Sequence, residues 1–443
     1  MVLALAVYGS AVLLVGLLTA RSSSRSSESF LVGDRAFGAV ATWAALSSTV
    51  VGGSTTLVLA ALVASRGLPG LWLDLAGILG LLALGLFLAP RIRSTSAVTI
   101  SEVIGQIYGP GVRRIAAGLV VAAEIVWFAL LTEATQIVVV AATPWDPTRV
   151  LVGTAALFVA YTALGGQRAV VGTDVLQFAL MAAALVGLAL PLAVRSLART
   201  GVPAELLTFP TGPRMGWIDI LALLVLVGLP HAVGGDVWAK VLSARDAATA
   251  RRAAVGAAAS KLVFGAATAT IALAGVAAHV GGPPASLFPR TVLALAGSAL
   301  APLVFVAMIA TMQSSCDSVL LSAAAATTHD LVPRWRSAGA ARVCVVVFGA
   351  LGLLVALVLR DLVETFRLGY TLFASSLILP VLAAFVPGLR VDRRFAGAAM
   401  LLGGAAALAE RFTHVLGIDP VLAGTAVNAA VLAFGVRPGP ERD

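Results

Sequence analysis

The residues Ser47-Ser-Thr-Val-Val-Gly-Gly-Ser-Thr-Thr56 interrupt a long apolar stretch with hydroxyl side chains and two adjacent glycines. In the hydrocarbon of a membrane, an unpaired backbone group costs several kcal/mol, so a helix breaks there only where it lines a cavity. A second interruption, Gly228-Leu-Pro-His-Ala-Val-Gly-Gly235, lies five apolar spans later. Either break alone is weak evidence, because Gly and Pro are common in membrane helices. Transporters place such breaks at matching positions of two inverted repeats, and the pair predicts that architecture here.

The composition points to a helical membrane protein. Of the 443 residues, 60% are AVILMFWYC and only 12% are charged, against roughly 45–50% apolar and about 25% charged in soluble domains. This excludes a soluble enzyme, a disordered chain and a fibre, and the apolar runs are too continuous for an outer-membrane barrel. The net charge of +9 does not require a nucleic-acid partner, because loop arginines that set membrane topology account for it.

Thirteen segments are long and apolar enough to span the bilayer, since a transmembrane helix needs about 20 mainly apolar residues. The first could be a signal peptide, but it lacks a basic leading region, which favours a retained span. The expected spans are 1–20, 38–64, 70–90, 112–141, 148–164, 171–194, 217–235, 253–279, 298–327, 340–359, 366–388, 394–411 and 420–436.

The loop charges predict an orientation. With the N-terminus outside, the inner loops carry 20 Lys and Arg residues and the outer loops carry 9. Positive residues concentrate on the cytoplasmic side, so this count predicts that the N-terminus lies outside and the C-terminus inside. We therefore expect a multi-pass protein of the inner (plasma) membrane of a bacterium.

The breaks and spans divide the chain into five parts. We expect a peripheral span with its inner loop (1–37), a first five-helix repeat (38–194), an outer linker (195–216), a second five-helix repeat (217–388), and peripheral C-terminal spans with a tail (389–443). The loops are too short to hold a separate soluble domain. The sequence contains no G-x-x-x-x-G-K-[ST] motif and no cluster of His and Cys, so neither ATP drive nor a metalloenzyme is expected.

The ninth span carries the densest set of polar side chains. Its hydroxyl residues follow helical spacing that places them on one face, and hydroxyl oxygens suit hard cations. The alternative is that these hydroxyls bond to the carbonyl one turn earlier or join helices together. The polar residues of this span are Thr311, Ser314, Ser315, Asp317, Ser318 and Ser322.

Ionisable residues inside membrane spans are costly and usually functional. We expect Asp236 and Lys240, four residues apart near the end of the seventh span, to form a structural ion pair. Glu124 and Glu133 either face the cavity or pair with neighbours. The remaining candidates are Asp74, Asp174, His231 and Lys261.

Several motifs resemble the sodium/solute symporter family, which includes sodium-coupled carriers of proline, pantothenate, sialic acid and sugars. They occur in order over residues 28–390, although Lys240 stands where the family usually has Arg. The matching stretches are Phe30-Leu-Val-Gly-Asp-Arg35, Thr99-Ile-Ser-Glu102, Tyr161-Thr-Ala-Leu-Gly-Gly-Gln-Arg-Ala-Val-Val-Gly-Thr-Asp-Val-Leu-Gln177, Asp236-Val-Trp-Ala-Lys-Val-Leu-Ser-Ala-Arg-Asp246, Ser314-Ser-Cys-Asp-Ser318 and Thr327-Thr-His-Asp330.

This resemblance implies an all-α membrane fold of the LeuT type, with a 5+5 inverted repeat and about thirteen helices. It implies a sodium site made by backbone carbonyls of Ser48, Val51 and Thr311 and by the hydroxyls of Ser314 and Ser315. Some members have a second sodium site, and its matching positions are Asp174, Asp317 and Ser318.

Solute-contacting positions follow less firmly, because such contacts vary with the solute. The residue match implies Thr55, Asp74, Val227, Pro230 and Lys261, and His231 in the second break joins them as a candidate.

The function expected from these observations is sodium-coupled import of a small polar organic solute by alternating access. Two alternatives stay open. One is a proton-coupled carrier of the same fold, with Asp174 or Asp317 as the relay, and the other is a solute sensor that has lost transport. The sequence leaves the solute, the sodium stoichiometry and the oligomeric state undetermined.

Overall fold

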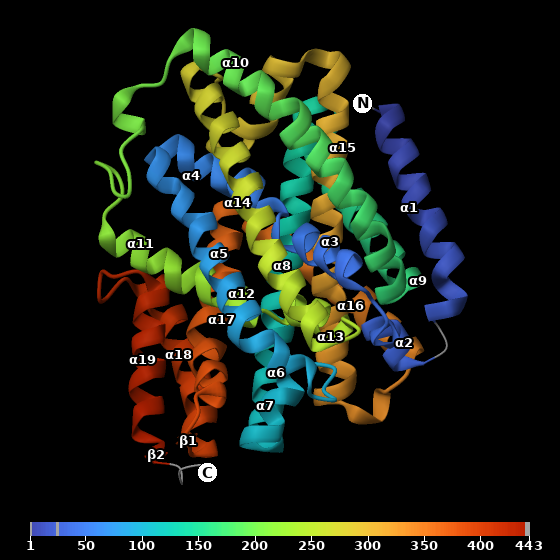
Figure 1. Ribbon diagram of the computed structural model, residues 1–443, viewed down its shortest axis with the longest axis vertical. Helices are drawn as coiled ribbons and strands as arrows, with labels where there is room; N and C mark the ends of the chain where they lie inside the picture. The colour runs from blue at the N-terminus through green and yellow to red at the C-terminus, as the bar shows by residue number, and fades with distance from the viewer. Residues whose placement is uncertain (1, 24–25, 439–443) are drawn as a thin grey trace.

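The computed structural model describes residues 2–23 and 26–438 and shows a bundle of helices (Figure 1). A single pair of short strands, β1 (Leu389–Val391) and β2 (Val436–Pro438), joins the described C-terminal residues to the end of α17. The helices are α1 (Val2–Ser23), α2 (Ser27–Val32), α3 (Ala39–Val50), α4 (Leu59–Arg66), α5 (Trp72–Ala83), α6 (Ala89–Arg93), α7 (Ile100–Tyr108), α8 (Pro110–Ala142), α9 (Pro147–Met181), α10 (Leu190–Thr200), α11 (Trp217–Leu223), α12 (Leu229–Val233), α13 (Gly235–Ser243), α14 (Ala247–Ala277), α15 (Leu287–Ala325), α16 (Ala338–Leu359), α17 (Leu362–Phe385), α18 (Arg393–Thr413) and α19 (Pro420–Phe434).

Among the described residues, ten helices are long and apolar enough to cross a membrane, or eleven if the bent pair α3 and α4 forms one span. One of them, 147–200, contains two of the expected spans. A straight helix of its 54 residues would be roughly 81 Å long, against a hydrocarbon core of about 30 Å. The chain turns at Gly166, whose φ of 58° and ψ of −167° lie outside the helical region. The count of thirteen and the side on which each terminus lies stay predictions.

The first expected break is present between α3 and α4. Helix α3 ends at Val50, and a π-helical segment, η2 (Ser54–Val58), leads into α4. The helices before and after the break differ in direction by 52°. A Cβ atom on Gly52 would lie 2.5 Å from the Ser315 hydroxyl oxygen, and one on Gly53 would lie 2.9 Å from the Ala134 methyl. The two glycines therefore allow α15 and α8 to approach the broken backbone closely.

The second expected break lies between α12 and α13. Gly234 is extended, with φ of −60° and ψ of 140°, and α13 begins at the next residue. The indole nitrogen of Trp238 donates to the Ala232 carbonyl at 2.9 Å and so joins the two half-helices across the break. The sequence therefore predicts the location of both interruptions.

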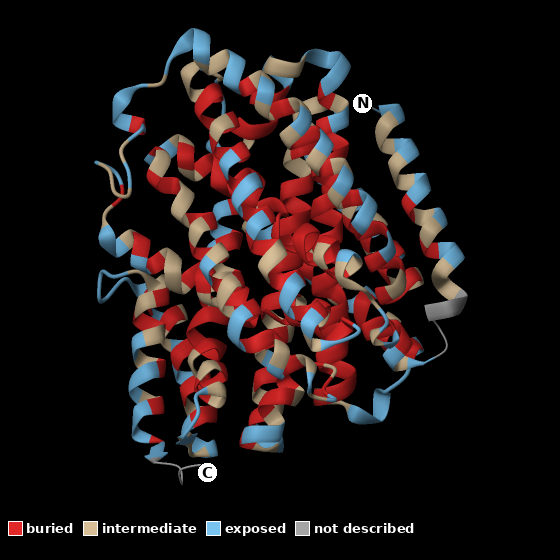
Figure 2. Ribbon diagram, viewed as in Figure 1, coloured by how far each residue is buried: buried red, intermediate tan, exposed pale blue. Residues whose placement is uncertain are grey.

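Helix α15 forms the centre of the bundle. All residues from 304 to 330 are buried, and buried residues gather around this helix in Figure 2. It packs against α3, α8, α9, α13, α14 and α16. A helix enclosed on every side usually carries apolar residues throughout, so hydroxyl and carboxyl groups in this position need partners. Those partners define the site.

Candidate ion and solute site

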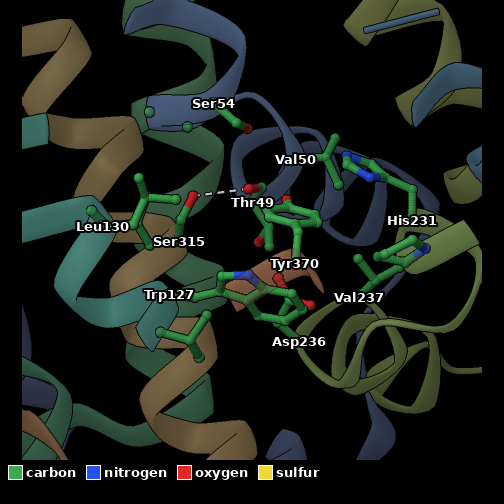
Figure 3. A pocket seen from close by; sticks show the side chains of 15 residues that line it. Thr49, Val50, Ser54, Trp127, Leu130, His231, Asp236, Val237, Ser315 and Tyr370 are labelled. Carbon is green, nitrogen blue, oxygen red and sulfur yellow. Dashed lines mark hydrogen bonds between the residues drawn. The ribbon is translucent and has the colours of Figure 1, made fainter. Parts of the chain in front are cut away.

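The hydroxyl-bearing side of α15 faces the first helix break. The Ser315 hydroxyl oxygen lies 2.8 Å from the Thr49 carbonyl oxygen (Figure 3). It also lies 3.1 Å from the Thr311 carbonyl oxygen, so its single proton is shared between the two acceptors. The same oxygen lies over Gly52. Ser48 and Val51 occupy the last turn and the cap of α3. The structure therefore places four of the five expected sodium-binding residues at one junction of α3 and α15.

The groups at this junction fit a hard monovalent cation. The last carbonyls of a helix lack intrahelical partners, and the partial negative charge there favours a cation. The Ser48 hydroxyl oxygen is buried and has no hydrogen-bond partner among the described residues. A hydroxyl that donates its proton, as Ser315 does, still has lone pairs to offer. All these groups are oxygens, which is the chemistry that sodium requires.

Ser314, the fifth expected residue, turns toward α9 instead. Its hydroxyl donates to Asp174 Oδ1 at 2.5 Å. The other carboxylate oxygen of Asp174 accepts from the Lys240 ammonium group at 2.8 Å. The predicted ion pair between Asp236 and Lys240 is therefore wrong, because Lys240 reaches across to α9 and neutralises Asp174.

The other two residues of the possible second sodium or relay site lie beside Ser314. Asp317 accepts from the Thr162 hydroxyl at 2.5 Å through Oδ1, and its Oδ2 has no hydrogen-bond partner among the described residues. The Ser318 hydroxyl donates to the Ser314 carbonyl at 2.9 Å and lies 3.2 Å from the Thr49 hydroxyl. Thr49 thus contacts Ser315 through its carbonyl oxygen and Ser318 through its hydroxyl. The sequence does not indicate this role of Thr49.

Three of the expected solute residues form a buried network behind the break. The Lys261 ammonium group lies 2.9 Å from Asp74 Oδ1, 2.6 Å from the Thr55 hydroxyl and 3.0 Å from the Val50 carbonyl. Thr55 in turn donates to Asp74 at 3.1 Å. The second oxygen of Asp74 is buried and has no hydrogen-bond partner in the part of the chain that the structure describes. The network ties α5 and α14 to the end of α3.

A small cavity of about 50 Å³ lies between the two helix breaks. Pro230 and His231, both expected to contact solute, line it. A 2.8 Å contact between His231 Nδ1 and the Val227 carbonyl oxygen orients the imidazole ring. The ring stacks on Tyr370, with the two ring centroids 6.4 Å apart. The Thr55–Asp74–Lys261 network and Val227 are not among the lining residues.

The cavity also has lining residues that the sequence did not single out. Trp127 from α8 and Tyr370 from α17 face it with their rings 5.1 Å apart (Figure 3). Ser54 and Asp236 line it as well. Single aromatic residues in apolar spans carry no distinguishing pattern. The sequence predicts Asp236 as the ion-pair partner of Lys240 and not as a cavity residue.

A sequence model of the sodium:solute symporter family matches residues 30–403. The chain belongs to this family. The match covers most of the chain and confirms the resemblance drawn from the motifs. Family membership indicates sodium as the coupling ion, and the oxygen atoms at the junction suit a hard cation. The protein is therefore a sodium-coupled symporter with multiple membrane-spanning helices.

Solved structures of transporters share this fold. A sodium-coupled sialic acid symporter in a substrate-bound outward-open state matches with a TM-score of 0.82 and 19% identity, over 99% of this chain and 98% of that one. MhsT in complex with L-phenylalanine matches with a TM-score of 0.60 and 16% identity, over 89% and 97% of the two chains. Mhp1, a nucleobase-cation-symport-1 family transporter in a closed conformation with bound bromovinylhydantoin, matches with a TM-score of 0.62 and 13% identity, over 91% of this chain and 94% of that one.

The structural similarity establishes the LeuT-type fold. Sequence identities of 13% to 19% do not establish the solute of this symporter. A search of curated protein sequences finds no match.

Proposed function

We propose that this symporter imports a small polar organic solute together with sodium by alternating access. The observation that carries the proposal is the contact of Ser315 with Thr49 and Gly52, where a hydroxyl-bearing helix meets the end of a broken one. Sodium bound there by Ser48, Val51, Thr311 and Ser315 joins α3 to α15, and Ser314 completes the expected set when its hydroxyl turns from Asp174 toward the ion. Binding of sodium then favours the arrangement of α3 that receives solute, and by linkage solute favours sodium equally.

The energy available is sufficient for concentrative uptake. One charge moving through ~100 mV yields about 2.3 kcal/mol, and a roughly tenfold sodium gradient adds about 1.4 kcal/mol. The total of about 3.7 kcal/mol supports several-hundred-fold accumulation of a neutral solute at one sodium per solute.

The size of the cavity supports movement during transport. Ligand pockets usually enclose about 300–1,000 Å³, whereas the cavity between the breaks encloses about 50 Å³. An organic solute therefore needs α3 and α13 to separate from α8 and α17 before it fits against Trp127 and Tyr370. Rocking of one repeat against the other supplies that separation in alternating access.

The buried pair of Asp74 and Lys261 favours a zwitterionic solute. The two residues present opposite charges, and each satisfies the other in this conformation. The amino and carboxylate groups of an amino acid match such a pair when the cavity widens. The aromatic rings of Trp127 and Tyr370 then cover the apolar part of the solute.

A stability screen of the purified protein tests the proposal. The protein is heated with amino acids, sugars, carboxylates and vitamins in sodium and, separately, in potassium. We expect one class of solute to stabilise the protein in sodium. We expect the double variant Asp74→Asn/Lys261→Met, which removes both charges of the pair, to lose that response while keeping the response to sodium alone. Equal stabilisation by solute in potassium would contradict sodium coupling.

A proton-coupled mechanism is the second candidate, favoured by one observation. Asp317 is buried near Asp174, and its Oδ2 has no hydrogen-bond partner within residues 2–23 and 26–438, which suits a proton relay. Uptake driven by a pH gradient without sodium, and lost in Asp317→Asn, would support it. Solute binding without counterflow would instead indicate a sensor that no longer transports.

A further inference from the structure

Glu124, in the middle of α8, is a buried carboxylate that the proposed function does not use. Only 1% of the residue is exposed, and neither carboxylate oxygen has a hydrogen-bond partner among the described residues. The Ser322 hydroxyl on α15 and the backbone and carboxylate of Asp236 on α13 are close enough to interact with it electrostatically. An ionised carboxylate in such a position is very costly unless a cation or several donors accompany it.

The carboxylate of Glu124 and the hydroxyl of Ser322 meet over Gly235, the first residue of α13. A Cβ atom on Gly235 would lie 2.8 Å from Glu124 Oε1 and 2.6 Å from Ser322 Oγ. The absent side chain is what lets both oxygens reach the second helix break. The break therefore carries an oxygen cluster of its own, distinct from the Ser315 junction at the first break.

This cluster lies between two cavities. Asp236 lines the 50 Å³ cavity that also contacts Thr49 and Ser315. On the other side, Gly235 and Ser322 line a smaller cavity of about 10 Å³ that reaches Thr99, in the segment before α7. That segment follows Arg91 and Arg93 and belongs to a loop expected on the inner side. Gly235, which lies beside Glu124, and Asp236 therefore separate the cavity at the first break from a smaller cavity near a loop expected on the inner side.

The charges around the cluster do not balance. When both carboxyl groups are ionised, Glu124 and Asp236 together bring two negative charges, and the start of α13 contributes about half a positive charge. Lys240 is the basic residue on α13, and it is paired with Asp174. No ion pair among residues 2–23 and 26–438 involves Glu124 or Asp236. One additional monovalent cation brings the sum near neutrality.

We propose that Glu124, Asp236 and Ser322 form a second sodium-binding site, through which the ion passes after it leaves the Ser315 junction. Two carboxylates and a hydroxyl are hard oxygen ligands suited to sodium. The proposal extends sodium-coupled transport by this fold, but its test measures ion binding to the protein without solute. The site is separate from the Asp174–Asp317–Ser318 group. In that group, Lys240 and Ser314 already contact both carboxylate oxygens of Asp174.

Equilibrium binding of radioactive sodium to the purified protein tests the site. We expect Glu124→Gln to remove one bound sodium or to weaken it about ten- to hundredfold, the range for loss of one charged contact. Gly235→Ala keeps every ligand but places a methyl group between Glu124 and Ser322, and we expect the same loss. Sodium bound with wild-type number and affinity in both variants would overturn the proposal.

Glu133→Gln is the matched control. Glu133 lies on the same helix and is also buried, and one of its oxygens has no hydrogen-bond partner among the described residues. Its other oxygen accepts from Thr365 at 3.2 Å, and it lines a separate cavity with Pro147 and Arg360. We expect it to bind sodium as the wild type does. A loss equal to that of Glu124→Gln would show a general effect of removing a buried carboxyl group and would overturn the assignment.

Infrared difference spectra give a direct readout for the residue. Adding sodium should change the carboxyl bands of the wild type and of Glu133→Gln, and that change should be absent from Glu124→Gln. Ser315→Ala separates this site from the proposed function. If Ser315→Ala binds normally while Glu124→Gln does not, the first junction fails and the second site stands. If Glu124→Gln binds sodium normally while Ser315→Ala does not, the second site is rejected and the first junction stands.

Discussion

Lys240 on α13 and Asp174 on α9 form a buried ion pair, with 2.8 Å between the ammonium nitrogen and Oδ2. The side chains are 1% and 0% exposed. The pair connects the second broken helix to the segment that follows the turn at Gly166. It is therefore a contact between the two expected repeats, and it keeps the carboxylate beside Ser314 satisfied.

Removing either partner of this pair should destabilise the protein strongly. Lys240→Met leaves Asp174 as an uncompensated buried charge, which costs about 3–5 kcal/mol. We expect a lower free energy of unfolding in detergent by that amount, measured with denaturant. Lys240→Arg keeps the charge and should remain close to the wild type. A Lys240→Met variant as stable as the wild type would show that the pair does not hold the two helices together.

Ser315→Ala should weaken sodium binding, because it removes one hydroxyl oxygen from the junction with α3. Loss of a contact to a charged group costs about 1.5–3 kcal/mol, which corresponds to roughly a ten- to hundredfold higher sodium concentration for half-maximal uptake. Thr311→Val is the control on the same helix face. The Thr311 hydroxyl bonds to the Met308 carbonyl at 2.8 Å, and only the Thr311 backbone carbonyl is expected to bind sodium. If both variants lose affinity equally, the assignment of Ser315 is wrong.

Gly52→Ala tests whether the close approach of α15 matters. The added methyl group would lie 2.5 Å from the Ser315 hydroxyl oxygen and 3.4 Å from Leu131 Cδ2. Overpacking of this kind typically costs about 1–3 kcal/mol, and here it displaces the proposed sodium ligand itself. We expect sodium-driven uptake to fall sharply. Gly118→Ala, where nothing lies within 4 Å of the new atom, should transport normally, and uptake by Gly52→Ala at the wild-type rate would contradict the role of the junction.

The sequence predicts the broken helices better than the side-chain contacts around them. Glycines at 52–53 and 234–235 within apolar spans mark both interruptions, because few other residues permit such close backbone packing. The polar stripe of α15 was also evident. Its division was not: neighbouring positions on a helix point about 100° apart, so Ser315 faces α3 while Ser314 faces Asp174 on α9.

Long-range partners explain the remaining differences. Local spacing favoured a pair of Asp236 with Lys240, but Lys240 pairs with a residue 66 positions earlier. The packing of α9 and α13 against α15 determines that choice, and a single sequence does not encode it visibly. The same holds for Trp127 and Tyr370, which come together only when α8 packs against α17.

The orientation predicted from the arginine count can be tested with introduced cysteines. Thr200, at the end of α10, and Ser94, after α6, are both exposed and are expected on opposite sides of the membrane. The natural Cys316 and Cys344 are buried, so background labelling should be low. A maleimide that does not cross membranes should label Thr200→Cys in intact cells and Ser94→Cys only after the membrane is opened. The reversed pattern would place the N-terminus inside. The positive-inside rule would then fail for this chain, and sodium passing Glu124 toward Thr99 would move outward.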